Sequence, residues 1–272
     1  LVKQENSKFF LGKIDSIINI AAFRDGTTYD LLKKIEANTK SLGSVSDVKV
    51  GLGAYGIGKG LPIQTQSMIK DRIYHSDSKK GSDWFPYIEG KDVSRYHLGW
   101  SGEYLKHGEH LREPRRDWKL FSTPRILVRQ IPGQPPYCIH ACFTDKVILN
   151  DRNSMNIINI KEQPFFILAL LNSRLLSFWF IHKFGKLQRG IFPQFKINEL
   201  EQFPIANSSN QKLIVTKVKS IFQAKAKKRD TSVFEREIDD MVYKLYGLTY
   251  DEVKIIEPEY NSMSREEYEA CA

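Results

Sequence analysis

The chain has 272 residues, 41% of them hydrophobic, which is enough to bury one large core or two modest ones and argues against a disordered chain. Its three cysteines are an odd number without a framework spacing, which argues against a secreted disulfide scaffold and favours a cytoplasmic protein. The formal net charge of +9 suggests a polyanionic partner.

The positive charge is confined to the first three quarters of the chain. Residues 207–272 hold 11 Lys and Arg against 12 Asp and Glu, whereas residues 1–206 hold 30 against 20. A polyanion is therefore expected to meet the first part. The chain opens on Leu1 without a signal peptide, so we expect a fragment of a longer protein.

The sequence predicts an α+β fold in three parts. Residues 1–40 are a helical lead-in, with a short helix over 28–38 that begins at the cap-like Thr28. Residues 41–206 are a β-rich domain, because short β-branched runs alternate with Gly, Pro and Ser clusters. Residues 207–272 are a C-terminal helical region. The strands expected in the β-rich domain cover residues 45–50, 125–131, 137–143, 146–149 and 155–160.

One long apolar run predicts a buried helix late in the β-rich domain. The helix is expected over residues 165–184, after Pro164 and before Gly185. Asn172, Ser173 and Arg174 interrupt the run, and a charged group at the centre of a bilayer is costly. We therefore expect a core helix and no membrane association. A further strand is expected over residues 200–205.

The C-terminal region carries helix-capping patterns. Ser232 and Glu235 have capping-box spacing before an amphipathic stretch, and Gly247 stands where a helix ends. Thr249 and Glu252 repeat the capping box before a last short helix. Another helix is expected over residues 211–228.

A glycine-rich stretch, GLGAYGIGKG at residues 51–60, approaches two phosphate-binding patterns. A P-loop needs Ser or Thr after its Lys and then a helix, but Gly60 and Pro62 follow here. We therefore expect a flexible turn after a strand. Backbone that lies close to a nucleic-acid phosphate is the alternative.

Two further motifs suggest chemistry that we do not expect. The segment QPPY at residues 134–137 is similar to the Asn/Asp-Pro-Pro-Tyr loop of amino-methyltransferases, but Gln is one methylene too long and no glycine-rich turn for S-adenosylmethionine precedes it. A Pro-rich hairpin loop is expected instead. Cys138, His140 and Cys142 alternate along one strand, but a structural zinc site needs a fourth ligand. Small buried residues explain the cysteines.

Asp83, Glu89 and Lys91 offer the D…ExK arrangement with which many nucleases hold Mg²⁺ and orient water. Short matches of this kind arise by chance in a chain that is 27% charged, and Gly90 occupies the usual apolar position. A Mg²⁺-dependent nuclease is the alternative function.

Two stretches concentrate the positive charge. Residues 106–129 hold seven basic side chains against three acidic ones, interleaved with Trp118 and Phe121, and residues 183–196 hold four basic side chains and no acid. Lys and Arg on loops neutralise phosphates, while Arg and Gln make bidentate contacts to base edges. These stretches suit double-stranded DNA, and a merely solvated basic face is the alternative.

The order of these motifs resembles the TaqI-like C-terminal specificity domain of adenine DNA methyltransferases and of type II and IIG restriction-modification enzymes. It is more distantly similar to the target-recognition domains of type I specificity subunits. The resemblance covers most of the chain, residues 28–257. The segments that carry it are the glycine stretch 51–60, YIEGKDV at 87–93, PRILVR at 124–129, LNSRL at 171–175, RG at 189–190, LEQFPI at 200–205 and EIDDMVYKLYGLT at 237–249.

The resemblance implies that residues 41–206 are a DNA target-recognition domain, which docks in the major groove of double-stranded DNA and chooses the site. It implies a separate catalytic methyltransferase domain, in the same parent chain or in a partner subunit. S-adenosylmethionine would bind to that catalytic domain, as would Mg²⁺ if the parent enzyme also cleaves DNA. In this chain we expect neither a cofactor nor a catalytic residue.

Candidate DNA contacts are chosen by side-chain type near predicted loop edges. Phosphate contacts are expected from Lys59, Lys91, Arg95, Arg112, Arg115 and Lys186. Base contacts are expected from Arg129, Gln134, Gln188 and Arg189.

Overall fold

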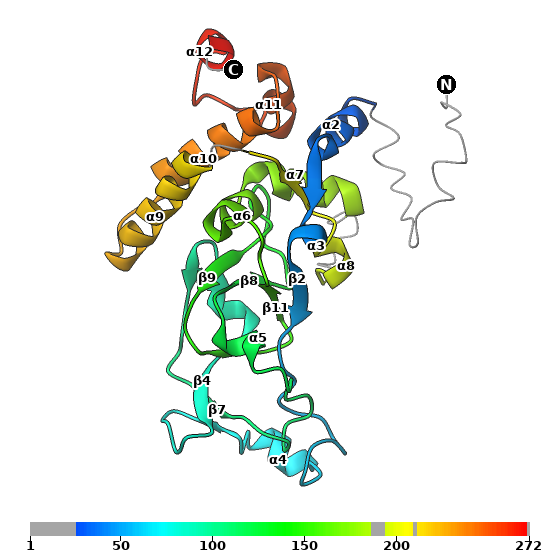
Figure 1. Ribbon diagram of the computed structural model, residues 1–272, viewed down its shortest axis with the longest axis vertical. Coiled ribbons are helices and arrows are strands. Elements are labelled where there is room, and N and C mark those ends of the chain that lie inside the picture. The colour runs from blue at the N-terminus through cyan, green and yellow to red at the C-terminus, as the bar shows by residue number, and fades with distance from the viewer. Residues whose placement is uncertain (1–25, 186–193, 209–210, 271–272) are drawn as a thin grey trace, which may run out of the picture.

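The computed structural model describes residues 26–185, 194–208 and 211–270 and confirms the predicted α+β fold (Figure 1). Helices from the end of the chain lie at one end of the long axis, the largest sheet and its covering helices lie in the middle, and a smaller sheet lies at the other end. The leading helix α2 (Gly26–Glu36) starts two residues before the predicted range and packs against α7 (Arg174–Phe184).

The central sheet is antiparallel throughout, in the order β2-β11-β8-β9. Alternate residues of its strands enter different clusters: Ile126 and Val128 join the largest core, whereas Leu127 joins a smaller cluster on the opposite face. Both faces are covered, which explains the continuous apolar run in β8. The strands are β2 (Asp47–Val50), β8 (Arg125–Arg129), β9 (Ala141–Thr144) and β11 (Ser154–Ile158).

The second sheet has the order β10-β4-β7-β3, and only its β10–β4 pair is parallel. Its apolar face covers a separate cluster that includes Tyr87, Leu105 and Leu149. The strand predicted over 146–149 overlaps β10 in part, and the other three strands were not predicted. They are β3 (His75–Ser76), β4 (Trp84–Ile88), β7 (Tyr104–Lys106) and β10 (Leu149–Asn150).

Strand β1 (Thr39–Ser41) pairs with β12 (Pro204–Ala206), so the two predicted borders of the 41–206 domain lie side by side. The borders themselves stay a prediction. The strand expected over 200–205 is wrong in its first half, because α8 ends at Leu200. The other short elements are α3 (Leu42–Val45), α4 (Gln66–Lys70), η2 (Gly90–Asp92), β5 (Val93–Ser94), β6 (His97–Leu98), α5 (Lys119–Ser122) and α8 (Ile197–Leu200).

The single helix expected over 165–184 is wrong. It is two helices, α6 (Pro164–Leu171) and α7, bent by 61° at Asn172-Ser173. Ser173 caps α7, because its Oγ accepts a hydrogen bond from the Leu176 N–H at 3.2 Å. The Asn172 side chain leaves the helix to bond the backbone of β9. The polar residues therefore start a new helix inside the core.

The strand predicted over 137–143 begins only at Ala141. Residues 137–140 lie outside the strand, and polar groups of the first two bond elsewhere. The Cys138 N–H donates to Ser177 Oγ at 3.0 Å, and the Tyr137 hydroxyl donates to Asp239 at 2.7 Å. Residues 137–140 therefore connect the sheet to α7 and to the C-terminal helices.

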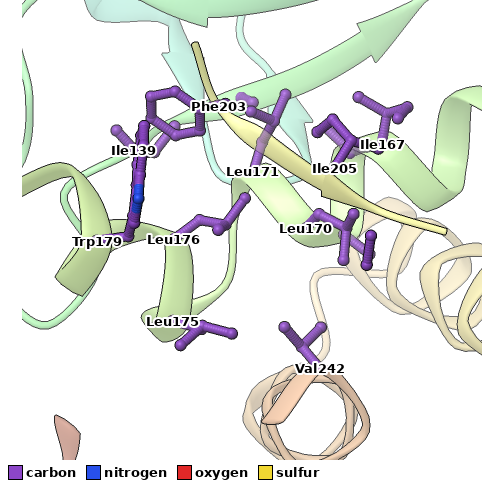
Figure 2. Packing of buried hydrophobic residues seen from close by; sticks show 14 of the residues in the cluster. Ile139, Ile167, Leu170, Leu171, Leu175, Leu176, Trp179, Phe203, Ile205 and Val242 are labelled. Atoms are coloured by element: carbon purple, nitrogen blue, oxygen red, sulfur yellow. The ribbon is translucent and has the colours of Figure 1, made fainter. Parts of the chain in front are cut away.

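The largest core lies around the bend between α6 and α7 (Figure 2). Leu170 and Leu171 of α6, Trp179 of α7 and Phe203 are each 0–1% exposed and pack together there. The helix α10 (Ser232–Leu245) adds Val242 to the same cluster. The core therefore unites the sheet, the bent helices and the C-terminal region.

The C-terminal region is helical, as predicted. Its α9 and α10 lie against each other and contact the bent helices, and Gly247 follows α10 with a φ of +67°. The Thr249–Glu252 capping box is confirmed. The predicted Ser232 cap is off by one residue, because Thr231 is the N-cap and its hydroxyl donates to Glu235 at 2.6 Å. The helices not yet bounded are α9 (Lys212–Ala226), α11 (Tyr250–Ile256) and α12 (Arg265–Ala270).

Among the described residues, no single helix is long and apolar enough to cross a membrane. Within the same described ranges, α6 and α7 reach the necessary length and composition only when they are taken together across their bend.

Candidate nucleic-acid interface

The glycine-rich loop 51–60 packs closely against a neighbouring loop of the protein. A Cβ atom on Gly60 would meet the His110 carbonyl oxygen at 2.2 Å, and one on Gly51 would meet the Asp151 carbonyl oxygen at 2.1 Å. Glycine is required at both positions because the backbone passes so near. The loop is held in place by other parts of the chain and is not the free turn that we expected.

Beside this loop, three arginines share one carboxylate. The Glu113 carboxylate forms ion pairs with the guanidinium groups of Arg152, Arg115 and Arg112. The N–O distances are 2.6, 3.2 and 3.5 Å, respectively. The Gly53 and Glu113 backbones exchange two hydrogen bonds, which fixes the carboxylate next to the glycine loop. One negative charge faces three positive ones, so two positive charges remain for another partner. The side chains are 34–47% exposed, so a phosphate can reach them.

Two depressions carry the positive charge on the surface. The first, of about 350 Å³, is lined by Arg112, Arg115 and Arg116 together with Leu61 of the loop. The second, of about 180 Å³, is lined by Lys91 and Arg129 together with Glu89, Gly90, Ile131 and Asn153.

The turn between β10 and β11 joins the two depressions. Its Arg152 pairs with Glu113, which also pairs with Arg112 and Arg115 of the first depression, while its Asn153 lines the second. Asp151 orders the turn by accepting hydrogen bonds from the Asn153 backbone N–H and side-chain amide, at 3.1 and 2.6 Å. We call the whole surface the basic face. Its cationic members are Lys59, Lys91, Arg112, Arg115, Arg116, Arg129 and Arg152.

The net charge of the basic face is positive because, among the residues that the structure describes, only three carboxylates pair with its cations. Glu109 pairs with Arg116, Glu113 pairs with its three arginines, and Glu89 pairs with Lys91 at 2.7 Å. Arg129 has no ion-pair partner within the described part of the chain. Seven positive charges therefore face three negative ones.

The structure gathers five of the ten predicted contact residues on the basic face: Lys59, Lys91, Arg112, Arg115 and Arg129. Gln134 is exposed on the β8–β9 loop but lines neither depression. The remaining residue with a described position, Arg95, lies elsewhere. The predictions for Lys186, Gln188 and Arg189 lie outside the described residues.

Arg95 connects parts of the protein to one another. Its guanidinium stacks 3.6 Å from the centroid of the Tyr137 ring, pairs with Glu235 of α10 at 2.5 Å and donates to the Asn172 carbonyl oxygen at 3.0 and 3.2 Å. Its side chain is 15% exposed. These contacts join the β-rich part to the bend between α6 and α7 and to α10. They occupy the guanidinium group of Arg95 that was predicted to contact a phosphate.

The same junction contains a buried carboxyl group. Asp239 of α10 accepts hydrogen bonds from the Tyr137 hydroxyl at 2.7 Å and from the Arg174 backbone N–H at 2.9 Å. Burial raises the pKa of Asp239 to about 6.

The geometry opposes the nuclease alternative. Asp83 and Glu89 lie at opposite ends of β4, and six residues of extended strand span roughly 20 Å. Asp83 pairs with Lys106, whereas Glu89 pairs with Arg72 and Lys91. Across the described ranges, no three His, Cys, Asp or Glu side chains are placed to share a metal ion.

Two members of the basic face, Arg116 and Arg152, were not predicted from the sequence. Arg116 lies in a stretch that was identified as basic but was not selected, and its side chain is 83% exposed. Arg152 lies outside both basic stretches and reaches Glu113 across 39 residues of sequence. An isolated Arg in a turn carries no sequence signal for such a contact.

Comparison with known proteins gives a family match to the β-rich part. Residues 85–205 match the TaqI-like C-terminal specificity domain. A curated relative from Methanocaldococcus jannaschii, named "Putative type II restriction enzyme and methyltransferase", is 23% identical over 192 residues, which are 67% of this chain. The chain spans 16% of the length of that relative.

Solved structures with similar chains also come from restriction-modification systems. The type IIL enzyme MmeI in complex with DNA has a TM-score of 0.48 at 11% identity, over 85% of this chain and 36% of that one. The HsdS subunit from Thermoanaerobacter tengcongensis has a TM-score of 0.38 at 12% identity, over 84% of this chain and 52% of that one. The matched family residues run from β4 to β12 and hold most of the basic face. Residues 85–205 are therefore similar to the TaqI-like C-terminal specificity domain.

Proposed function

We propose that this chain is the DNA target-recognition module of a restriction-modification enzyme and that it binds double-stranded DNA without catalysing a reaction. The observation that carries the proposal is the carboxylate that three arginines share. The single negative charge of Glu113 neutralises only one of the three positive charges around it. Phosphates of a DNA backbone supply the missing negative charges. The family match and the restriction-modification relative support the same function.

Within this proposal the two depressions have different roles. The cluster around Glu113, with Lys59 and Arg116, contacts phosphates and fixes the position of the domain on the duplex. Arg129 extends from the end of β8 into the second depression, where Lys91 accompanies it. An Arg with no ion pair within the described ranges can donate two hydrogen bonds to a guanine edge, so we assign Arg129 to base reading.

The chemistry of the parent enzyme belongs to a separate catalytic methyltransferase domain, in the same parent chain or in a partner subunit. That domain would bind S-adenosylmethionine, together with Mg²⁺ if the parent also cleaves DNA. The glycine loop of this chain does not suit a nucleotide-like cofactor, because its Gly51 and Gly60 lie against protein backbone. The roles proposed for Gln134, Lys186, Gln188 and Arg189 remain those of base and phosphate contacts.

Binding to a duplex of random sequence at two salt concentrations tests the proposal. If five or more phosphates are contacted, affinity should fall roughly a thousandfold between 50 and 200 mM salt. The double variant Arg112→Ala/Arg116→Ala should bind more weakly and reduce the slope of log affinity against log salt by about two.

The matched control is Lys227→Ala/Lys228→Ala, which removes two exposed charges next to the end of α9, far from the basic face (Figure 1). It should bind like the wild type. Absence of binding at 50 mM salt, or an equal loss in both double variants, contradicts the proposed function.

A further inference from the structure

Three large apolar side chains project from the loop between β2 and α4. Ile57, Leu61 and Ile63 are 67%, 71% and 65% exposed. The loop lies at the end of the molecule opposite the C-terminal helices (Figure 1). A contiguous group of exposed apolar side chains marks a contact surface more often than isolated ones do.

The loop is held in this shape from within. Gln64 is 1% exposed, and its side chain accepts a hydrogen bond from the Gly56 N–H at 2.7 Å and donates to the carbonyl oxygens of Ala54 and His110 at 2.9 and 2.7 Å. The Leu61 N–H donates to the Glu109 carbonyl oxygen at 2.9 Å. The buried amide thus fixes the loop backbone and leaves the apolar side chains in solvent.

Basic side chains lie beside the apolar tip, by which we mean the exposed side chains of Ile57, Leu61 and Ile63. Leu61 lines the same depression as Arg112, Arg115 and Arg116. Lys59 belongs to the loop itself, and Arg152 reaches the cluster through Glu113. The local carboxylates are Glu109 and Glu113, so five positive charges face two negative ones. The partner of this tip must therefore combine an apolar centre with a strongly negative rim.

A DNA groove has this combination, because two phosphate backbones border stacked bases with apolar faces. Leu, Ile and Pro side chains are among those that proteins insert between base steps. Pro62 stands between Leu61 and Ile63 and is itself exposed.

We propose that the loop 57–63 is a wedge that enters a groove of the bound duplex and unstacks a base step, while the surrounding arginines and Lys59 hold the phosphates on either side. This inference rests on the proposed function. It adds that the domain distorts its target, so part of its sequence preference comes from how readily a step opens.

The test uses the 272-residue chain and a duplex enriched from a random pool by the wild type. The fluorescent base 2-aminopurine is placed at each step of that duplex in turn, and donor and acceptor dyes at the two ends report bending. The wild type should raise 2-aminopurine fluorescence several-fold at one step and shorten the distance between the ends.

The variant Leu61→Ser/Ile63→Ser should lose both signals. It should keep the wild-type salt slope, because every cation of the basic face is unchanged. The control Leu213→Ser/Val233→Ser removes side chains that are 56% and 67% exposed on α9 and α10, and should behave like the wild type. Urea midpoints of all four proteins, with a Gln64→Ala variant as the fourth, show whether the fold is intact.

Gln64→Ala should weaken the fluorescence signal although it leaves the apolar side chains in place, because the loop loses its internal support. Two results overturn the wedge while the proposed function stands: salt-dependent binding without unstacking by the wild type, or full unstacking by Leu61→Ser/Ile63→Ser. Absence of salt-dependent binding by the wild type overturns both.

Discussion

The side chain of Asn172 pairs with the backbone of Ala141 as a neighbouring strand would. The Ala141 N–H donates to Asn172 Oδ1, and Asn172 Nδ2 donates to the Ala141 carbonyl oxygen, both at 3.0 Å. Asn172 is fully buried, at the bend between α6 and α7. One amide therefore ends a helix and pairs with the first residue of the edge strand β9.

Replacing Asn172 by Leu should destabilise the protein by about 3 kcal/mol, because the Ala141 N–H would be buried without a partner and two hydrogen bonds would be lost. Urea unfolding measures the change. The control Asn207→Ala removes an exposed amide that donates to the Asn38 carbonyl oxygen, and should cost less than about 0.5 kcal/mol. Equal effects of the two substitutions would show that the pairing is unimportant.

Arg125 is a buried guanidinium at the start of β8, and its five recorded hydrogen bonds all end on uncharged oxygens. Its Nε donates to Asn156 Oδ1 at 3.0 Å, and its shortest hydrogen bond is to the Ile148 carbonyl oxygen, at 2.6 Å. Burial lowers the pKa of Arg125 to about 10, so it stays charged at neutral pH.

The substitution Arg125→Met should destabilise the protein by about 3 kcal/mol, because several buried carbonyl oxygens lose their donor. Chemical denaturation checks this. Arg116→Met, at a side chain that is 83% exposed, should leave the midpoint unchanged. A midpoint of Arg125→Met that matched the wild type would refute the structural role.

Asp239 should make stability fall as pH rises from about 4 to about 6. The pKa of its carboxyl is raised to about 6 in the folded protein, against about 3.9 in the unfolded chain. Between these values the folded state binds more protons than the unfolded state, so its contribution is complete below pH 4 and is lost above pH 6.

The measurement is the stability of Asp239→Asn relative to wild type, at several pH values. The free energy of unfolding of the variant, minus that of the wild type, should increase as pH rises through this window. The wild type loses the contribution of Asp239, whereas the amide of the variant does not titrate. Asp145→Asn, at an exposed residue, serves as the control and should give a flat difference. A flat difference for Asp239→Asn as well would contradict the raised pKa.

Lys91 and Arg129 line the same depression, but their replacement should change DNA binding in different ways. Lys91→Ala should reduce the salt slope by about one, because a phosphate contact is lost at every sequence. Arg129→Ala should cost about 1–3 kcal/mol on the enriched duplex and much less on random DNA, because a base contact is lost. Competition binding on both duplexes separates these outcomes, and identical profiles would refute the assigned roles.

Local patterns in the sequence predicted much of the fold. Short runs of β-branched residues between Gly, Pro and Ser clusters located β8 and β11, and the capping box at Thr249 located α11, because each signal lies within a few residues. The break at Asn172 was missed because its partner, Ala141, is 31 residues away. A contact over that distance leaves no local trace.

The candidate site was predictable in its chemistry and only in part in its members. Side-chain type selected Arg112, Arg115 and Arg129 as DNA contacts; the structure places them on one surface, and the contacts themselves stay a prediction. The same criterion selected Arg95, because sequence gives no sign that Glu235 and Tyr137 would enclose its guanidinium. Which arginines face solvent is decided by tertiary contacts.

The central claim is that this chain selects a DNA sequence, and repeated selection from a random duplex pool tests it most directly. The wild type should enrich one consensus site and bind it about a thousandfold more tightly than random duplex at 150 mM salt. The Arg129→Ala variant should show a smaller ratio between its affinities for the selected and the random duplex. A pool that stays random after repeated selection, or equal affinity for selected and random duplexes, would contradict the claim.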